Sequence, residues 1–340
     1  MATVGCTIVG SVAEIDGRGH LRFAPRSEEH TDMKQEVARL KELAPGAGRP
    51  LPTISVVTPS LNQAEHVEAA LRSVLTQGYG ALEYVVIDGG STDGSTEIIR
   101  RYEEDLAFWA SEHDRGHAHA LNKGFAHTSG EIMCWINSSD LHYRWTLETV
   151  SQIFQQVPQV EWIMGMPSKF DLSGAPKSVG ASFCNMYDFL AGDYLWIQQE
   201  SVFWRRSLWE RAGARLNEDL TCAADLDLWL RFFREAKLYH VSTILAGYRV
   251  HDDRLGAKDR YAEEAETLVA QFTAQQDRRT ARRACVIRAV GHRHGQAHTL
   301  AKAMEKLGIC PWYRHPQVVF DFDDQLWKVR RGETLRNPGT

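Results

Sequence analysis

From residue 52 onward, short runs of apolar and β-branched residues alternate with longer segments whose apolar residues recur at helical spacing. The runs TISVVT, LEYVVID, FWAS and EIMCWI predict four strands. Apolar residues from Val67 to Leu75, the pair Ile98 and Ile99, and the segment HALNKGFAH predict the helices between them. Later, ADLDLWLRFF predicts an amphipathic helix whose Leu226 and Trp229 face the core. Strands that alternate with helices predict an α/β fold with a mostly parallel sheet flanked by helices.

The two ends of the chain have different patterns. Residues 1–50 predict an appendage: two short apolar runs around a Gly-rich turn form a hairpin, a helix follows, and PGAGRPLP is a linker. Residues 51–255 carry the strand and helix pattern, with one half at about 53–140 and the other at about 141–255. Polar helical patterns then run to the end, so we expect a helical C-terminal extension over 256–340.

Composition excludes several classes of protein. The chain has 340 residues, 43% of them hydrophobic and 24% charged, and a net charge of −5, so no overall basic field favours nucleic acid. Six cysteines without a CxxC pair argue against a disulfide framework or zinc ribbon and favour a reducing compartment. No run approaches the ~18 apolar residues of a membrane span, and no signal peptide is evident, so we expect a cytoplasmic protein.

The C-terminal extension has an excess of basic over acidic residues. Peripheral contact with an anionic membrane surface is one interpretation of this excess. The other is a solvated helical surface, which the interleaved acidic residues favour. The oligomeric state is left open.

Polar residues follow three of the predicted strands, in the segments 58–62, 88–95 and 137–140. In an open parallel sheet, ligands bind at the carboxyl ends of the strands. Asp88 ends a buried strand, where a carboxylate needs a partner, and it could accept a hydrogen bond from a base N–H or a ribose hydroxyl. Asp93 could instead cap the next helix. The sequence contains no GxGxxG after the first strand and no GxxxxGK[ST], which argues against dinucleotide and P-loop sites.

Seven strings now carry a resemblance to a known family. They are SVVTPSLNQ, EYVVIDGGSTDGSTEII, SEHDRGHAHALNKGF, GEIMCWINSSD, QQESVFWRR, AADLDLWLRF and YRVH, in this order over about residues 53–251. Together they resemble the inverting family 2 glycosyltransferases, which use nucleotide sugars and have the GT-A fold.

The resemblance implies a set of site residues. Those that would surround the nucleotide sugar are Thr58, Pro59, Ser60, Asn62, Asp88, Gly89, Ser91, Asp114, Arg115, Asn122, Lys123 and Ser139. Asp140 and His251 would hold a divalent metal, Mn²⁺ or Mg²⁺, which binds weakly without nucleotide. Asp225 would be the general base.

The same resemblance implies an acceptor site around the QQES string. Its residues would be Trp196, Gln199, Glu200 and Trp204, although core packing is the commoner role of Trp. The chain departs from the family pattern at two positions. Ser139 stands where the metal motif often has a carboxylate, and Ala224 stands where the base motif has Glu.

The expected reaction is transfer of a sugar from a nucleotide diphosphate donor to a hydroxyl of a glycan or glycolipid, with inversion. A UDP-sugar is favoured because Asp88 could accept the imide N–H of uracil. The two departures keep a second class open, a non-catalytic nucleotide-sugar-binding or scaffold protein. A nucleotidyltransferase is a third, but SLNQ offers no basic phosphate loop.

Overall fold

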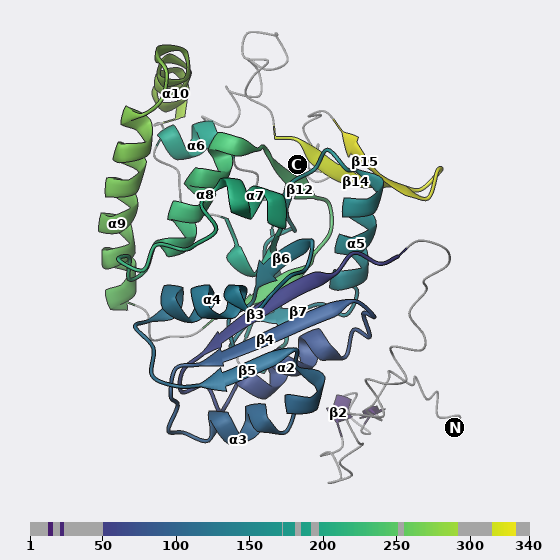
Figure 1. Cartoon of the computed structure of the whole chain (residues 1–340). Helices are drawn as coiled ribbons and strands as arrows, with labels where there is room; N and C mark the ends of the chain where they lie inside the picture. Colours follow the sequence, from purple (N-terminus) through teal and green to yellow (C-terminus); the bar gives the residue numbers. More distant parts are fainter. Residues whose placement is uncertain are drawn as a thin grey trace.

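The computed structural model of the chain describes residues 13–15, 21–23, 50–171, 173–180, 185–191, 197–250, 255–291 and 315–330 (Figure 1). Its helices are α2 (Val67–Leu75), α3 (Ser95–Arg100), α4 (His117–Ala126), α5 (Thr146–Gln156), α6 (Met186–Ala191), α7 (Arg206–Arg211), α8 (Ala224–Glu235), α9 (Leu255–Ala274) and α10 (Arg278–Gly291). Two 3₁₀ turns add η1 (Glu103–Asp105) and η2 (Gln199–Ser201). None of the helices in these ranges is long and apolar enough to cross a membrane.

A mixed, mostly parallel sheet of nine strands forms the centre of the molecule. Its order is β15 (Leu326–Arg330), β14 (Gln317–Asp321), β12 (Leu238–Val241), β8 (Trp162–Met164), β11 (Val202–Arg205), β6 (Ile132–Trp135), β3 (Ile54–Ser60), β4 (Leu82–Asp88) and β5 (Phe108–Ser111). The neighbours β6, β3, β4 and β5 are parallel to one another, whereas β11 runs antiparallel to both of its neighbours. All four strands predicted from the sequence are present, so the predicted α/β fold is confirmed.

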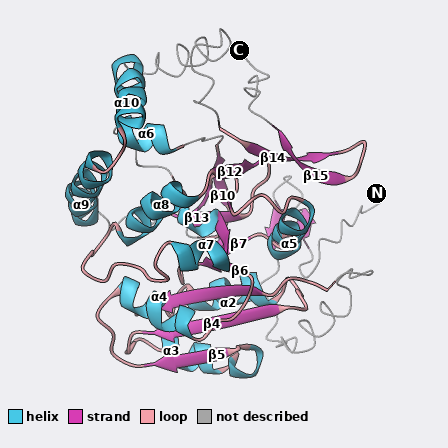
Figure 2. Cartoon of the chain, turned by 45° about the horizontal axis from the view of Figure 1, so that its top comes forward, coloured by secondary structure: helices cyan, strands magenta, loops and turns pink. Residues whose placement is uncertain are grey.

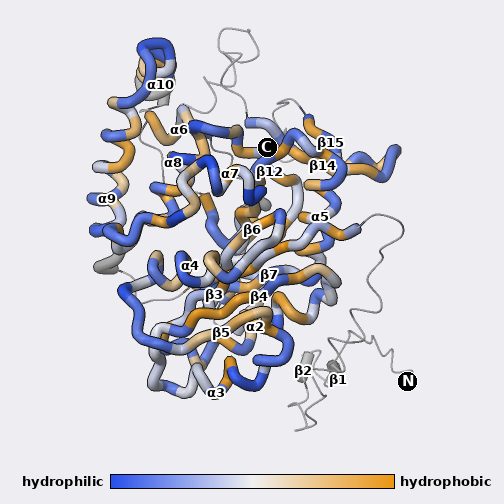
Figure 3. Tube along the Cα trace, viewed as in Figure 1, coloured by the Kyte–Doolittle hydropathy of each residue, from blue (hydrophilic) through white to orange (hydrophobic). Residues whose placement is uncertain are grey.

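Burial explains why these strands read as continuous apolar runs. Every residue of β3 is buried, as expected of a parallel strand covered on both faces. The helix α4 packs on β3 and β4, and α2 and α3 lie on the opposite face (Figures 1 and 2). Apolar residues accordingly follow these strands in Figure 3, and polar residues follow the outer surfaces of the helices.

A second sheet lies beside the first. Its order is β10 (Pro176–Val179), β9 (Ser168–Phe170), β13 (Ala246–Arg249) and β7 (Leu141–His142). Because β7 begins directly after Asp140 and β13 ends at Arg249, this sheet fixes the segment 137–140. The predicted hairpin at the N-terminus is confirmed as β1 (Ala13–Ile15) paired antiparallel with β2 (Leu21–Phe23), whereas the helix predicted near Met33 lies outside the described residues.

The C-terminal extension is only partly helical. The helices α9 and α10 are present as predicted, but β14 and β15 form a hairpin and β14 pairs with β12 at the end of the main sheet. The prediction of helices to the end of the chain is therefore wrong for residues 317–330. The reason is tertiary: β14 pairs with the distant strand β12, which buries Val318, while Trp327 of β15 is also buried and Gln325 adopts a φ of 54° in the turn between the two strands.

Candidate functional site

Strand register brings the predicted residues to one edge. Ser60, Asp88 and Ser111 are neighbours across β3, β4 and β5, each at the carboxyl end of its strand. On the other side of β3, Val57 pairs with Trp135 of β6, and the segment 137–140 follows that strand. The polar groups of these strand ends therefore meet at a single edge of the sheet.

Asp88 organises the loop that follows it. One carboxylate oxygen accepts a hydrogen bond from the Ser91 hydroxyl at 2.5 Å. The other accepts from the Gly90 and Ser91 N–H groups at 3.1 and 2.9 Å and from the Ser111 hydroxyl at 2.7 Å. Asp88 has no exposed surface. Its immediate partners are thus groups of the protein, and its contact with a nucleotide base stays a prediction.

The loop after β3 is tied to the loop after β4. Asn62, with a φ of 51°, donates its backbone N–H to the Ser91 hydroxyl at 2.7 Å, and its side-chain oxygen accepts the Thr92 N–H at 2.9 Å. In the same way, Asp93 accepts the Ala64 N–H at 2.8 Å. These bonds hold the loops after β3 and β4 against each other.

Thr58 and Ser60 behave differently at the end of β3. The Thr58 hydroxyl lies 2.9 Å from the Tyr84 hydroxyl and is fully buried, so a direct contact of Thr58 with the nucleotide is not supported. Ser60 is also buried, but within the described part of the chain its hydroxyl has no hydrogen-bond partner. An unsatisfied hydroxyl at the carboxyl end of a strand leaves Ser60 as a candidate for a ligand contact.

Asp114 approaches the Gly89 backbone closely. One of its oxygens accepts the Gly116 N–H at 2.8 Å, and the other would lie 2.7 Å from a Cβ atom at residue 89. Only glycine at residue 89 leaves this carboxylate in place. The predicted pair Gly89 and Asp114 is therefore brought together.

Three further residues that were predicted to surround the nucleotide sugar instead bind other parts of the protein. Arg115 forms a 2.5 Å ion pair with Glu218, and Asn122 both donates to and accepts from the Leu216 backbone, at 3.0 and 2.8 Å. Lys123 forms an ion pair with Glu112. Arg115 and Asn122 thus hold the loop that leads into α8, whereas Lys123 binds the residue that follows β5. The contact of all three side chains with the ribose or sugar stays a prediction.

The segment 137–140 presents one buried carboxylate. Asp140 accepts the Arg249 N–H at 3.0 Å on one oxygen and the Asn137 side-chain N–H at 3.2 Å on the other. The Arg249 guanidinium donates to the Ser139 carbonyl at 2.8 Å. His251 lies outside the described residues, among which no group of three or more His, Cys, Asp or Glu side chains could hold a metal ion. The only predicted metal ligand that the structure places is Asp140.

Three of the acceptor residues predicted around the QQES string, Gln199, Glu200 and Trp204, are buried, because η2 leads directly into β11, which runs between β6 and β8 in the middle of the sheet. The Gln199 side chain donates to the Trp135 carbonyl at 2.6 Å, and Trp204 is fully buried among other aromatic rings. We therefore correct the prediction that Trp204 and Gln199 contact an acceptor directly. Trp196 lies outside the described residues.

Glu200 is buried near two other acids. Its carboxylate accepts a hydrogen bond from the Gln198 side chain. Burial and the charges of Asp140 and Asp225 hold its pKa well above the usual value for Glu. A direct acceptor contact of Glu200 is not supported either, but the side chain joins Asp140 and Asp225 in one electrostatic cluster.

Asp225 lies in the first turn of α8, as predicted. Its carboxylate accepts the Leu226 N–H at 2.7 Å, and burial raises its pKa to about 6. Asp227 forms a 2.8 Å ion pair with Arg231 and turns away, as expected from its position on the helix.

Sequence reasoning overlooked several of these partners. Arg249 stands inside the YRVH string and Asn137 inside the 137–140 segment, so their positions were visible but their bonds to Asp140 were not. Glu218 carries no sequence signal. Its pKa is lowered by the hydrogen bond from Asn122 and the ion pair with Arg115, which only the fold brings together.

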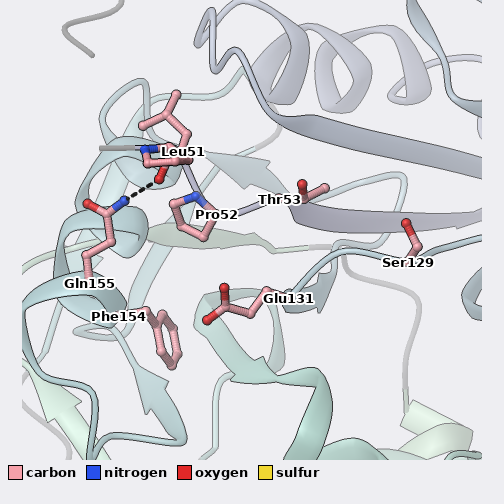
Figure 4. A pocket seen from close by; sticks show the side chains of 8 residues that line it. Leu51, Pro52, Thr53, Ser129, Glu131, Phe154 and Gln155 are labelled. Carbon is pink, nitrogen blue, oxygen red and sulfur yellow. Dashed lines mark hydrogen bonds between the residues drawn. The ribbon is translucent and has the colours of Figure 1, made fainter. Parts of the chain in front are cut away.

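A cavity of about 380 Å³ lies elsewhere, at the opposite end of β3 (Figure 4). Its lining residues are Pro50, Leu51, Pro52, Thr53, Ser129, Glu131, Phe154 and Gln155. Thr53 precedes the first residue of β3, whereas the polar edge begins at Ser60. The cavity is therefore separate from the carboxylate cluster.

Comparison with known proteins identifies the family. A model of glycosyl transferase family 2 matches residues 55–162. An uncharacterized glycosyltransferase of Mycobacterium tuberculosis is 32% identical over 184 residues, which cover 53% of this chain and 68% of the relative. One from Rickettsia typhi is 25% identical over 215 residues, covering 59% and 65%.

Solved structures give the same fold. S. aureus TarS 1–349 in complex with UDP-GlcNAc has a TM-score of 0.57 at 16% identity, over 77% of this chain and 78% of that one. A longer TarS chain is covered to 47% of its length. The likeness at this identity concerns the fold, which is GT-A-like. The chain therefore belongs to glycosyl transferase family 2 and is a glycosyltransferase.

Proposed function

We propose that the protein transfers a sugar from a UDP-sugar to a hydroxyl of a glycan or glycolipid, with inversion at the anomeric carbon. The observation that carries the proposal is that Asp140, which follows β6 at the carboxyl edge of the sheet, and Asp225 both act by their charges on the buried Glu200, in a chain of family 2. A partly buried carboxyl with a pKa of about 6 suits a general base near neutral pH.

In the proposed reaction, Asp225 accepts the proton of the acceptor hydroxyl. The hydroxyl oxygen attacks the anomeric carbon from the face opposite the diphosphate, and the bond between that carbon and the diphosphate oxygen breaks. The nucleoside diphosphate leaves with the electron pair of that bond. The bonded loops after β3 and β4 would hold the donor in line for this displacement.

A divalent cation would neutralise the leaving diphosphate. Asp140 would be its protein ligand, and His251 stays a predicted second one. One carboxylate is a small donor set for a hard cation, so most ligands must come from phosphate oxygens and water. We therefore expect Mn²⁺ or Mg²⁺ to bind weakly to the protein alone and measurably with UDP. Calorimetry with and without UDP tests this, and tight binding of Mn²⁺ alone would contradict it.

The second candidate function is a non-catalytic nucleotide-sugar-binding protein, because Ser139 and Ala224 replace acidic residues of the family pattern. The two are separated by incubating the protein with a panel of UDP-sugars and Mn²⁺. Release of UDP above the rate of the Asp225→Asn variant supports the enzyme. Binding of UDP without release supports the second candidate. The cytoplasmic location and the peripheral membrane contact stay predictions.

A further inference from the structure

The helix α9 lies along one side of the molecule, next to α8 (Figures 1 and 2). It follows the segment that the family model matches by almost a hundred residues. Ala265, Val269 and Phe272 bury its inner face in the core. One polar residue of this helix, Glu264, faces the start of α8.

Glu264 binds three consecutive backbone N–H groups. Its two carboxylate oxygens accept from Thr221 at 3.0 Å, Cys222 at 2.9 Å and Ala223 at 2.9 Å. Ala223 is the N-terminal capping residue of α8, and it has no side-chain cap of its own. The carboxylate thus satisfies the N–H of the capping residue, which a helix start leaves without a partner, and the N–H groups of the two residues before it.

Burial alone would raise the pKa of Glu264, but the three N–H groups outweigh burial and lower it. Arg260 on the same helix also lowers this pKa. Glu264 is therefore a carboxylate at neutral pH. It places a negative charge against Ala223, which precedes Asp225 by two residues in the chain.

We propose that Glu264 is a positioning residue for Asp225, an inference that rests on the proposed function of Asp225 as the base. By holding residues 221–223, Glu264 fixes the first turn of α8 and with it the direction of the Asp225 carboxylate. This assigns the C-terminal extension a part in catalysis. The Asp225 carboxylate accepts the N–H of Leu226 in the same helix turn, so its place depends on the helix start.

The charge of Glu264 has a second consequence. Among the acidic groups of neighbouring elements, Glu264 on α9 raises the pKa of Asp225, whereas the charge of Asp225 in turn raises the pKa of Glu200 on η2. On α8 itself, Asp227 is neutralised by its ion pair with Arg231. Removing the charge of Glu264 should therefore lower the pKa of Asp225.

The test compares Glu264→Gln and Glu264→Ala with Glu266→Gln in the full chain. Glu266 is exposed on the same helix and supplies the matched loss of one charge. In Glu264→Gln, the acid side of the kcat profile should move to lower pH by about 0.3–1 unit, since one nearby charge is lost. In Glu264→Ala, kcat should fall about tenfold or more with the KM for the donor nearly unchanged, because small misplacements of a catalytic group are costly.

For the control variant Glu266→Gln, we expect the same pH profile of kcat as for the wild type. The proposal is overturned if Glu264→Gln keeps the wild-type profile, or if it shifts no more than Glu266→Gln. If Glu264→Ala fails to fold, Glu264→Gln alone decides, because the shift of the profile does not follow from stability.

A second measurement separates this proposal from the proposed function. The pKa of the Asp225 carboxyl, followed by carbon NMR titration, should be lower in Glu264→Gln than in Glu266→Gln. If the pKa of Asp225 is lowered in Glu264→Gln but the wild-type protein turns over none of the UDP-sugars, the proposed function is overturned and the effect of Glu264 on Asp225 stands. An unchanged pKa in an active enzyme would overturn the positioning role alone.

Discussion

Asp88 at the end of β4 and Asp225 in the first turn of α8 are carboxyl groups in opposite surroundings. Asp88 ends β4 with at least four N–H and O–H donors on its two oxygens and no exposed surface. Asp225 begins α8 with one N–H donor, and an acidic neighbour adds to the burial that raises its pKa to about 6. The first carboxylate is satisfied by the protein around it, and the second is not.

This contrast distinguishes a carboxylate that stabilises the fold from a carboxyl group that can take part in catalysis. A carboxylate whose charge is fully met by fixed donors stabilises the loop that provides them. A carboxyl whose charged form is disfavoured can take up a proton near neutral pH, and such groups gather at functional sites. The contrast predicts that changes at Asp88 act through the structure of the loop, whereas changes at Asp225 act on the rate.

The largest effect is expected from Asp225→Asn. Asparagine keeps the shape of the side chain but cannot accept the proton, so kcat should fall by roughly 10²–10⁴-fold, the usual share of a general base. The affinity for UDP should stay nearly unchanged. Steady-state transfer kinetics and calorimetry measure both. Transfer at the wild-type rate would assign the base to another residue and remove the contrast with Asp88.

Asp88→Ala should come next. Its buried donors lose their acceptor, so the free energy of unfolding should fall by about 2–3 kcal/mol and the affinity for UDP by about 1.5–3 kcal/mol. Urea unfolding and calorimetry measure the two losses. A loss of affinity with unchanged stability would make Asp88 a direct ligand contact and not an organiser of the loop. Ser111→Ala, which removes a single donor, should show a smaller loss of stability.

The pH dependence of the wild-type enzyme should give an intermediate effect. Asp225 must be deprotonated to act as a base, so kcat should rise about tenfold per pH unit below pH 6 and level off above it. A profile that is already flat at pH 5 would show that the acting group has an ordinary carboxylate pKa. Measurements of kcat from pH 4.5 to 8 with saturating donor decide this.

The sequence predicted the fold well where the pattern was local. Buried parallel strands such as β3 and β4 are continuous apolar runs, and α8 shows its buried face through Leu226 and Trp229. It failed for β14, whose pairing with β12 depends on a strand far away in the chain.

The site was also predicted only in part, because local patterns reveal where a residue stands in the chain but not what the fold packs around it. Residues that follow a strand, such as Asp88 and Asp140, could be placed at one edge from the topology alone. Burial could not be inferred, so Gln199, Glu200 and Trp204 were expected at a surface although β11 runs through the middle of the sheet. Glu264 was missed because it acts from a helix about forty residues beyond Asp225.

The smallest predicted effect concerns stability, again at Asp225. Its pKa is about 6 in the folded protein against 3.8 as the ordinary value, so the folded state binds this proton more tightly. Stability from this group is complete below pH 4 and is lost as the pH rises through 6. Because asparagine does not titrate, Asp225→Asn should be more stable than the wild type by about 1–2 kcal/mol at pH 8 and lose that advantage near pH 4. Asp227→Asn, which breaks the pair with Arg231, should instead be slightly less stable than the wild type at pH 8. Urea unfolding of the three proteins at pH 4 and pH 8 measures the difference. If Asp225→Asn is the less stable protein at pH 8, the Asp225 carboxylate is satisfied in the folded state, and the contrast with Asp88 does not hold.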